Sequence, residues 1–324
     1  MFDFNVTKTS TNIDIDAESL SFSQLLKVTW DSVHNNTNAF RYKIGNIPER
    51  FVNEKYLLQL NPNRGTKRRA PEQFLDICQP FDETKFNFTK ASEYEIMFTF
   101  RENEKDDIHA VLVNVSPISR YHSLLCISID NCLPQVISKD NLKLAVDLML
   151  YAKDRDLRIG FNSLCAWASI NHLHYHLFYE KNTLPVEEVK CKHLAGPLHI
   201  LDDSYAAQGF CFEITPSYKI DIIFKLLEHF LKNSIAHNII LTRGDTINGD
   251  SVEGLRLIIF PRKSSCGPKL FKGFNVAVCE LSGWFPVYSK EDFWSFQVED
   301  LQKELRRWQI DNFKKLCEDV KLLY

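Results

Sequence analysis

The sequence of 324 residues predicts an α+β fold built around one antiparallel sheet. Two observations predict this fold class. Short runs of β-branched and aromatic residues, separated by charged or Pro-containing turns, are typical of an antiparallel meander. One helical pattern then separates these runs from two further strand patterns. No fixed-period repeat or long Gly/Ser/Pro linker divides the chain, so we expect residues 1–324 to form a single compact unit.

Near the start of the chain there is a helical pattern at 21–33, and an extended segment follows at 50–60. Ser138 is a predicted N-cap for a helix at 138–154. The apolar face of this helix is formed by Leu142, Ala145, Val146, Met149 and Leu150. Strands are predicted before and after it, at 94–100, 109–115, 122–129, 157–164 and 172–180.

The second half repeats this order loosely, which predicts a degenerate second copy of the first. A helix is expected at 216–233, and strands are expected at 238–244, 255–262 and 276–284. A helical tail follows from about residue 290, with a predicted buried stripe of Leu301, Leu305, Trp308, Phe313, Leu316 and Val320. We therefore divide the unit into a first half, 40–190, and a second half with the helical tail, 191–324.

The overall charge and composition exclude several classes of protein. The net charge of -3 and the pI of about 6.4 give no field that favours nucleic acid or an anionic membrane. No signal peptide or membrane-spanning run of about 20 apolar residues is present, which predicts a cytoplasmic protein. The nine scattered cysteines are interpreted as reduced thiols. The sequence also contains neither a Walker A motif nor GxGxxG, so a P-loop or Rossmann phosphate site has no support.

Three of the 10 histidines alternate within one short segment: His172, His174 and His176. If 172–179 is a strand, these three side chains share one face. They could be packing residues, metal ligands or a nucleophile with its supporting groups. As a nucleophile toward phosphorus, an imidazole needs one unprotonated nitrogen, with the other nitrogen held as N–H by an acceptor. His174, the middle residue, is the best placed for this role.

The segment "NSLCAWASINHLHYHLFY" (162–179) resembles the histidine-triad signature, in which an Asn on one strand precedes His-x-His-x-His on the next. The upstream segment 114–128 resembles the preceding strand pair of that superfamily, with His122 in its usual place. Together with five ordered blocks, this similarity points to the GDP-hexose phosphorylases, in the galactose-1-phosphate uridylyltransferase branch. The five blocks are 79–90, 161–164, 170–179, 184–189 and 276–283.

The resemblance implies a histidine-triad-like sheet, with the catalytic motif in the half 40–190. It also implies a phosphorolysis in which GDP-glucose and inorganic phosphate give glucose 1-phosphate and GDP. The small-molecule partners would be inorganic phosphate and a GDP-hexose, with GDP-D-glucose the expected one. No cofactor or metal is required by this chemistry. The sequence leaves a homodimer open.

The resemblance also implies roles for individual residues. His174 would carry a transient guanylyl group, the carbonyl of His172 would orient its ring, and His176 would hold phosphoryl oxygens. Asn162 and Ser169 would add neutral donors. The uridylyltransferases and plant phosphorylases have Gln where this chain has His176, whereas hydrolytic triad proteins have His. Three alternatives therefore stay open: a metal-dependent hydrolase, a histidine-triad nucleotide hydrolase and a non-catalytic nucleotide-binding protein.

Two further polar groups are candidates for binding the substrate. In "KFNFTK", Lys85, Asn87 and Lys90 could reach the phosphates or the base, although an ordinary strand would show the same alternation. The turn at 61–72 concentrates four cations that could bind an anion, although such a cluster is more often a solvated loop. These cations are Arg64, Lys67, Arg68 and Arg69. Glu280 is expected to be paired with a cation or to contact the sugar, because an unpaired buried carboxylate is costly.

Overall fold

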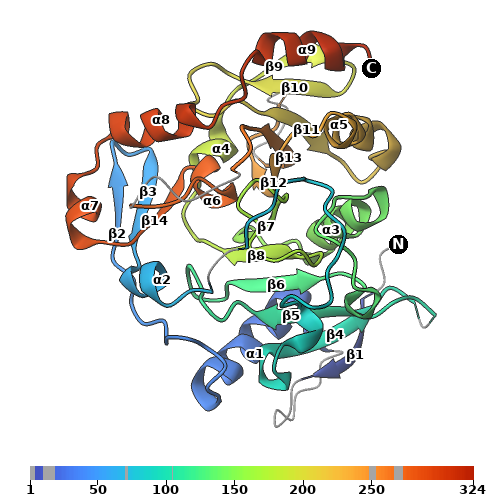
Figure 1. Cartoon of the computed structure of the whole chain (residues 1–324), viewed down its shortest axis with the longest axis vertical. Coiled ribbons are helices and arrows are strands. Elements are labelled where there is room, and N and C mark those ends of the chain that lie inside the picture. Colours follow the sequence, from blue (N-terminus) through green and yellow to red (C-terminus); the bar gives the residue numbers. More distant parts are fainter. Residues whose placement is uncertain (1–3, 10–18, 70–71, 104, 248–252, 266–272) are drawn as a thin grey trace.

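The computed structural model of the chain describes residues 4–9, 19–69, 72–103, 105–247, 253–265 and 273–324. Eleven strands of these residues form one sheet in the order β1-β4-β5-β6-β8-β7-β12-β13-β11-β10-β9. Each of its strand pairs is antiparallel, which confirms the predicted fold class. In Figure 1 the sheet runs the length of the molecule, from β1 and β4 at one end to β9 and β10 at the other.

The strands of this sheet are β1 (Asn5–Thr9), β4 (Ile96–Arg101), β5 (His109–Val113), β6 (Ser123–Cys126), β7 (Leu157–Asn162), β8 (Tyr175–Tyr179), β9 (Cys191–Ala195), β10 (Leu198–Leu201), β11 (Phe210–Ile214), β12 (His237–Gly244) and β13 (Gly254–Pro261). The helices are α1 (Phe22–Asn36), α2 (Pro62–Thr66), α3 (Lys139–Ala152), α4 (Pro185–Glu188), α5 (Ile220–Lys232), α6 (Val278–Leu281), α7 (Lys290–Ser295), α8 (Val298–Arg307) and α9 (Phe313–Lys321).

Both halves of the sheet have the same topology. In each half, three strands form a meander and are followed by a helix and two further strands. The last of these two strands pairs with the third strand of the meander. The first half is β4-β5-β6-α3-β7-β8 and the second is β9-β10-β11-α5-β12-β13. The halves join where β7 pairs with β12, with Asn162 opposite Asn238. The second half is therefore a topological copy of the first.

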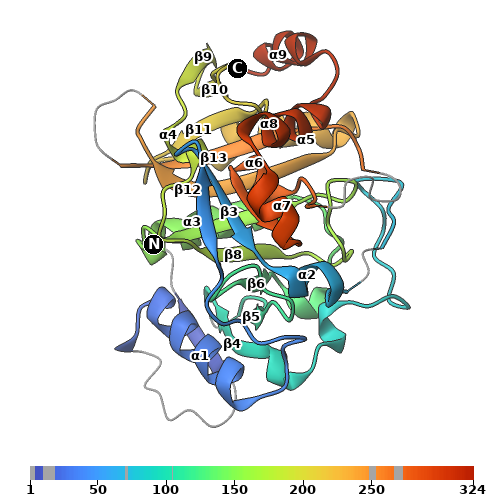
Figure 2. The same cartoon turned by 90° about the vertical axis from the view of Figure 1, so that its left-hand side faces the viewer.

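The two faces of the main sheet are covered differently. On one face, α1, α3 and α5 pack into the larger hydrophobic core with alternate residues of the strands, such as Tyr175 and Leu177 of β8. Ser138 caps α3 through a capping box, as predicted. The other face is covered by a small sheet of β2 (Glu49–Val52), β3 (Tyr56–Leu60) and β14 (Trp284–Val287), together with α4 and α6–α8 (Figure 2). Since His176 alternates with Tyr175 and Leu177, it points toward this second layer.

The predicted strand at 276–284 is wrong. Residues from Val278 form the short helix α6, and the strand β14 begins only at Trp284. The carboxylate of Glu280 accepts a hydrogen bond from the Ala277 N–H at 2.9 Å and so satisfies a donor at the start of the helix. Gly283 then turns the chain with a positive φ of 89°. The apolar run that suggested a strand is buried because α6 packs on β7, where Gly160 leaves room for Val278.

The predicted start of the histidine strand is also wrong, because β8 begins at Tyr175 and not at His172. The main-chain N–H and carbonyl of His174 bond to a side chain instead of to a neighbouring strand. Gln135 Oε1 accepts from the His174 N–H at 2.8 Å, and Gln135 Nε2 donates to the His174 carbonyl at 2.9 Å. Before residue 40, β1 pairs with β4 and α1 packs on β4.

Three smaller observations complete the fold. The extended segment at 50–60 is a hairpin that turns at Asn53 and Glu54, both with positive φ. In the helical tail, Trp308 and Phe313 are half-buried and the other four residues of the predicted stripe are buried. The eight described cysteines are free thiols, and Cys266 lies outside the described residues. Over the part of the chain that the structure describes, no helix is long and apolar enough to cross a membrane.

Candidate active site

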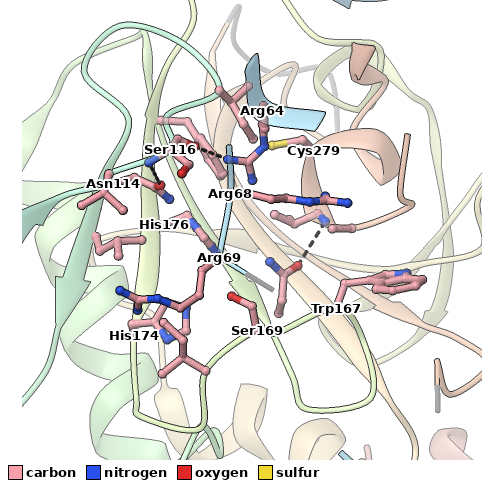
Figure 3. A pocket seen from close by; sticks show the side chains of 18 of the residues that line it. Arg64, Arg68, Arg69, Asn114, Ser116, Trp167, Ser169, His174, His176 and Cys279 are labelled. Carbon is pink, nitrogen blue, oxygen red and sulfur yellow. Dashed lines mark hydrogen bonds between the residues drawn. The ribbon is translucent and has the colours of Figure 1, made fainter. Parts of the chain in front are cut away.

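A pocket lies between the main sheet and the second layer. Its lining comes from the start of β8, the end of β7, the loop around α2, and α6. His174, His176, Asn162 and Ser169 all line it. Figure 3 shows the two histidines and Ser169 facing the same space as three arginine side chains. The structure thus brings together four of the eight residues that the sequence suggested.

The ring of His174 has one nitrogen fixed and the other free to react. Its Nδ1 lies 2.7 Å from the carbonyl oxygen of His172, so Nδ1 carries the proton and donates it there. Nε2 is therefore left with a lone pair. Burial lowers the pKa of His174 to about 4, with the His172 carbonyl opposing this shift and the His172 ring adding to it. At neutral pH His174 is an unprotonated imidazole with a defined tautomer.

The ring of His172 has a different environment from the other two. Its Nδ1 accepts a hydrogen bond from the Phe88 N–H at 3.0 Å, and it is not among the residues that line the pocket. The prediction that the three side chains share one face therefore does not hold for the ring of His172, since the strand begins only at Tyr175. Its ring instead holds Phe88, whose own ring packs 5.0 Å from that of His174. His172 contributes its carbonyl to the site and its side chain to the support of the pocket wall.

The tautomer of His176 is set through His122. The Ile118 N–H donates to His122 Nδ1 at 3.0 Å, so the proton of His122 is on Nε2. That Nε2 lies 3.1 Å from His176 Nδ1 and donates to it. His176 must then carry its own proton on Nε2. Burial lowers the pKa of both His122 and His176, and His174 and Arg64 lower that of His176 further. His176 is thus a neutral N–H donor beside His174, with 5.3 Å between the ring centroids.

Asn162 is oriented by two hydrogen bonds to its side-chain oxygen. Asn238 Nδ2 donates to Asn162 Oδ1 at 2.6 Å and the Val278 N–H donates at 3.1 Å. The amide NH₂ of Asn162 is therefore the group that remains for a ligand. Ser169 lies at the pocket edge in the loop that precedes His172. Both residues are available as the neutral donors that the resemblance implied.

The other three suggested residues are not brought to the pocket. Asn87 caps a short 3₁₀ turn by accepting from Thr89, and Lys90 donates to the main-chain carbonyls of Glu83 and Lys85. The Lys85 side chain is exposed. These polar groups are used to fold the 82–90 loop, and only Phe88 of this block lines the pocket. The expected contacts of Lys85, Asn87 and Lys90 with a ligand have no support in this geometry.

The signal in the sequence was weaker for the cations that do reach the pocket. Arg64, Arg68 and Arg69 line it, whereas Lys67 does not. Their clustering in the 61–72 turn was the detectable signal, although a solvated loop was the more common interpretation. The supporting residue Gln135 had no signal, because its contacts join segments about 40 residues apart. Within the described residues, no group of three His, Cys, Asp or Glu side chains could hold a metal ion.

Comparisons with known proteins agree with this architecture. The family description "GDPGP1-like, N-terminal domain" matches residues 21–178, and "GDPGP1-like, C-terminal domain" matches residues 190–322. GDP-D-glucose phosphorylase 1 of Danio rerio is 34% identical over 298 residues, which cover 89% of this chain and 86% of that protein. The Homo sapiens protein of the same name is 35% identical over 274 residues, covering 78% and 71%. GDP-L-galactose phosphorylase 2 of Arabidopsis thaliana is 30% identical over 288 residues, covering 78% and 65%.

Among solved structures, yeast Ap4A phosphorylase Apa2 in complex with AMP superposes with a TM-score of 0.61 at 13% identity. The superposition covers 89% of this chain and 96% of that one. At this level of identity the likeness shows a shared fold.

Proposed function

The chain belongs to the GDPGP1-like family, and from this membership we propose that it is a GDP-hexose phosphorylase acting on GDP-D-glucose. In this reaction a guanylyl group moves from the nucleotide sugar to inorganic phosphate through His174, which gives glucose 1-phosphate and GDP. The observation that carries the proposal is the state of His174: its Nδ1–H is held by a main-chain carbonyl and its unprotonated Nε2 belongs to the pocket.

In the first step, His174 Nε2 attacks the α-phosphorus of the GDP-hexose. An N–P bond forms, the bond between the α-phosphorus and the bridging oxygen breaks, and hexose 1-phosphate leaves with the bonding electrons. The ring is then positively charged, and the Nδ1–H donated to the His172 carbonyl stabilises that charge. No proton has to leave His174 for this step, because Nε2 starts as a lone pair.

In the second step, an oxygen of inorganic phosphate attacks the same phosphorus and breaks the N–P bond. GDP leaves, and His174 Nε2 recovers its lone pair. The Nε2–H of His176 and the NH₂ group of Asn162 are the proposed donors to the non-bridging oxygens, on which negative charge is concentrated during both transfers. Since both donors are neutral, they stabilise the phosphoryl group without competing for a proton.

The test is a panel of nucleotide sugars incubated with the purified protein, with and without phosphate. We expect GDP to form from GDP-glucose only when phosphate is present. We also expect about one equivalent of hexose 1-phosphate per active site to be released when phosphate is withheld, because His174 is then guanylylated and not regenerated. Equal amounts of GMP with and without phosphate would instead support a nucleotide hydrolase.

A further inference from the structure

We propose that Arg64 and Arg68 form the subsite for the acceptor phosphate, and that this subsite makes phosphate, and not water, the second substrate. The inference rests on the proposed function, since it assigns residues to the second step of that reaction. It departs from the interpretation of the 61–72 turn as a solvated loop. Three observations support it: the docking of this turn, the absence of carboxylate partners for Arg64 and Arg68 among the described residues, and the stereochemistry of a double displacement.

Residues 61–69 of this turn are docked onto the body of the protein. Asn61 is buried and donates through Nδ2 to the carbonyls of Pro117 and Ile118 at 3.1 and 3.2 Å. Ser116 Oγ donates to the Lys67 carbonyl at 2.9 Å. A side chain at Gly65 would bring its Cβ to 2.9 Å from Tyr288 Cβ, so this glycine permits the close approach of the turn to Tyr288.

The two guanidinium groups are held in place by neutral partners. Arg64 donates through Nη1 to the Ser116 carbonyl. Arg68 donates through Nη1 to the Tyr288 hydroxyl at 3.1 Å and lies over its ring, 5.2 Å from the centroid. Asn275 Nδ2 also donates to that hydroxyl at 3.1 Å. Because Tyr288 accepts from both neighbours, its own O–H is available to an acceptor in the pocket that it lines. Figure 3 shows Arg64 and Arg68 facing the pocket that His176 also lines.

Neither guanidinium has a carboxylate partner among the residues that the structure describes. No ion pair within 4.0 Å involves Arg64, Arg68 or Arg69 there. Arg69 is placed differently from the other two. Its guanidinium lies over the Phe86 ring and interacts electrostatically with the carboxylates of Glu95 and Glu72. Half-buried arginines without an internal anion are suited to an anionic ligand, which they can bind with paired N–H groups.

The mechanism requires one such subsite for two successive anions. In each in-line transfer, the attacking and leaving atoms lie on opposite sides of the phosphorus. His174 occupies one side in both steps, so the β-phosphoryl group leaves from the side that the acceptor phosphate later enters. The same cations therefore contact both groups. Arg64 is close enough to His176 for its charge to lower the pKa of that ring, after burial and His174, which places it near the proposed phosphoryl donors.

The test compares Arg68→Ala and Arg64→Ala with the matched control Lys67→Ala, whose side chain is exposed on the same turn and outside the pocket. Initial rates with GDP-glucose are measured over a range of phosphate concentrations, and GDP and GMP are quantified separately. We expect the arginine variants to raise KM for phosphate by about 10- to 100-fold, the loss typical of a charge-assisted contact. The share of GMP in the product should also rise, because water can still attack the guanylyl group.

Lys67→Ala should change neither quantity by more than about twofold. Arg68→Lys, which keeps the charge and loses the paired N–H groups, should lie between the alanine variant and the parent, and it replaces Arg68→Ala if that protein does not fold. Arginine variants with KM for phosphate and a GDP to GMP ratio within twofold of the parent would overturn the subsite while leaving the proposed function intact. A parent protein that makes no phosphate-dependent GDP would overturn both.

Discussion

In each half of the sheet a short helix packs on the equivalent strand, α6 on β7 and α4 on β12. A pocket lies beside α6 and β7. In the first half, α6 packs on β7 beside His174, and its Glu280 accepts from the Ala277 N–H at 2.9 Å. In the second half, α4 packs on β12, and its Glu187 accepts from the Leu184 N–H at 3.0 Å. The helices follow β13 and β8, which are equivalent strands in the repeated topology.

An internal ion-pair network lies beside α4 and β12. The Glu187 carboxylate is fully buried and accepts from Arg158 Nε at 2.7 Å and Nη2 at 3.1 Å. Thr242 also donates to it. Arg256, near the start of β13, donates to the carbonyls of Val189 and Asp245 at 2.7 and 2.6 Å. Arg158 therefore has a carboxylate partner within the chain, whereas Arg256 is held by carbonyl oxygens.

The difference shows how a duplicated scaffold can have one site. Where the chain supplies its own carboxylate, as Glu187 does for Arg158, the buried arginine is neutralised by an internal ion pair. At the pocket the chain supplies the imidazole of His174 and the guanidinium of Arg68, which has no carboxylate partner among the described residues. There the negative charge that balances the arginine has to come from a ligand. The following predictions test this contrast, beginning with the largest effect.

Replacement of His174 should have the largest effect on turnover, because His174 lines the pocket beside α6 and β7. His174→Ala removes the attacking nitrogen, so we expect turnover to fall by more than about 10⁴-fold, as for other covalent nucleophiles. Steady-state release of GDP measures this loss. Retention of even a tenth of the parent rate would rule out the covalent role.

His237 provides a matched control for this substitution. Its Nδ1 lies 2.9 Å from the carbonyl of Ile235, two residues before it, as in His174, and burial likewise lowers its pKa to about 4. It does not line the pocket. His237→Gln should lower the melting temperature but leave turnover per folded molecule within about twofold, because an ordered tautomer without access to substrate has no catalytic role.

Replacement of Glu187, in the ion-pair network beside α4 and β12, should have the largest effect on stability. Glu187→Ala leaves the buried Arg158 without its counter-charge, which should lower the free energy of unfolding by about 3–5 kcal/mol. Urea denaturation measures this loss. The neighbouring Glu188 is exposed, and Glu188→Ala should change stability by no more than about 0.5 kcal/mol. Equal free energies of unfolding for the two variants would show that the Glu187–Arg158 network does not stabilise this half of the sheet.

His122 should show an intermediate effect through the tautomer of His176. His122→Leu removes the donor to His176 Nδ1, so we expect kcat to fall by about 10- to 100-fold with the fold preserved. His122→Gln can accept from Ile118 and donate to His176, and it should recover much of this loss. A leucine variant as active as the glutamine variant would show that His122 only fills space.

The sequence predicted the parts of this architecture that depend on local patterns. The helix after Ser138 and the alternating strands follow from spacing and capping, and the tight grouping of His174 and His176 is visible in one segment. The run 276–284 was misassigned because an apolar β-branched run does not reveal that Glu280 will cap a short helix.

The sequence could not predict the contacts that join distant segments. Arg68 meets Tyr288 across 220 residues, and Gln135 meets His174 across 39. Neither pair has a local pattern, since each depends on how the second layer is placed over the sheet. The same limit explains why Lys85 and Lys90, which share a short block with two phenylalanines, were favoured over the cations that reach the pocket.

The smallest expected effect is that of pH on the first transfer. With a pKa of about 4, His174 is only about 1% protonated at pH 6, whereas a histidine of ordinary pKa near 6.5 would be mostly protonated there. The rate of the phosphate-independent release of hexose 1-phosphate should therefore change less than about twofold between pH 7.5 and 6.

Over the same pH range the free energy of unfolding should begin to fall. Below pH 6.5 the unfolded chain binds more protons at His174 and His237 than the folded chain does, so the free energy of unfolding decreases toward pH 4. A release rate that halves near pH 6.5 while the protein stays fully stable would mean that His174 is an ordinary solvated histidine, and the distinction between the two halves would lose its main support.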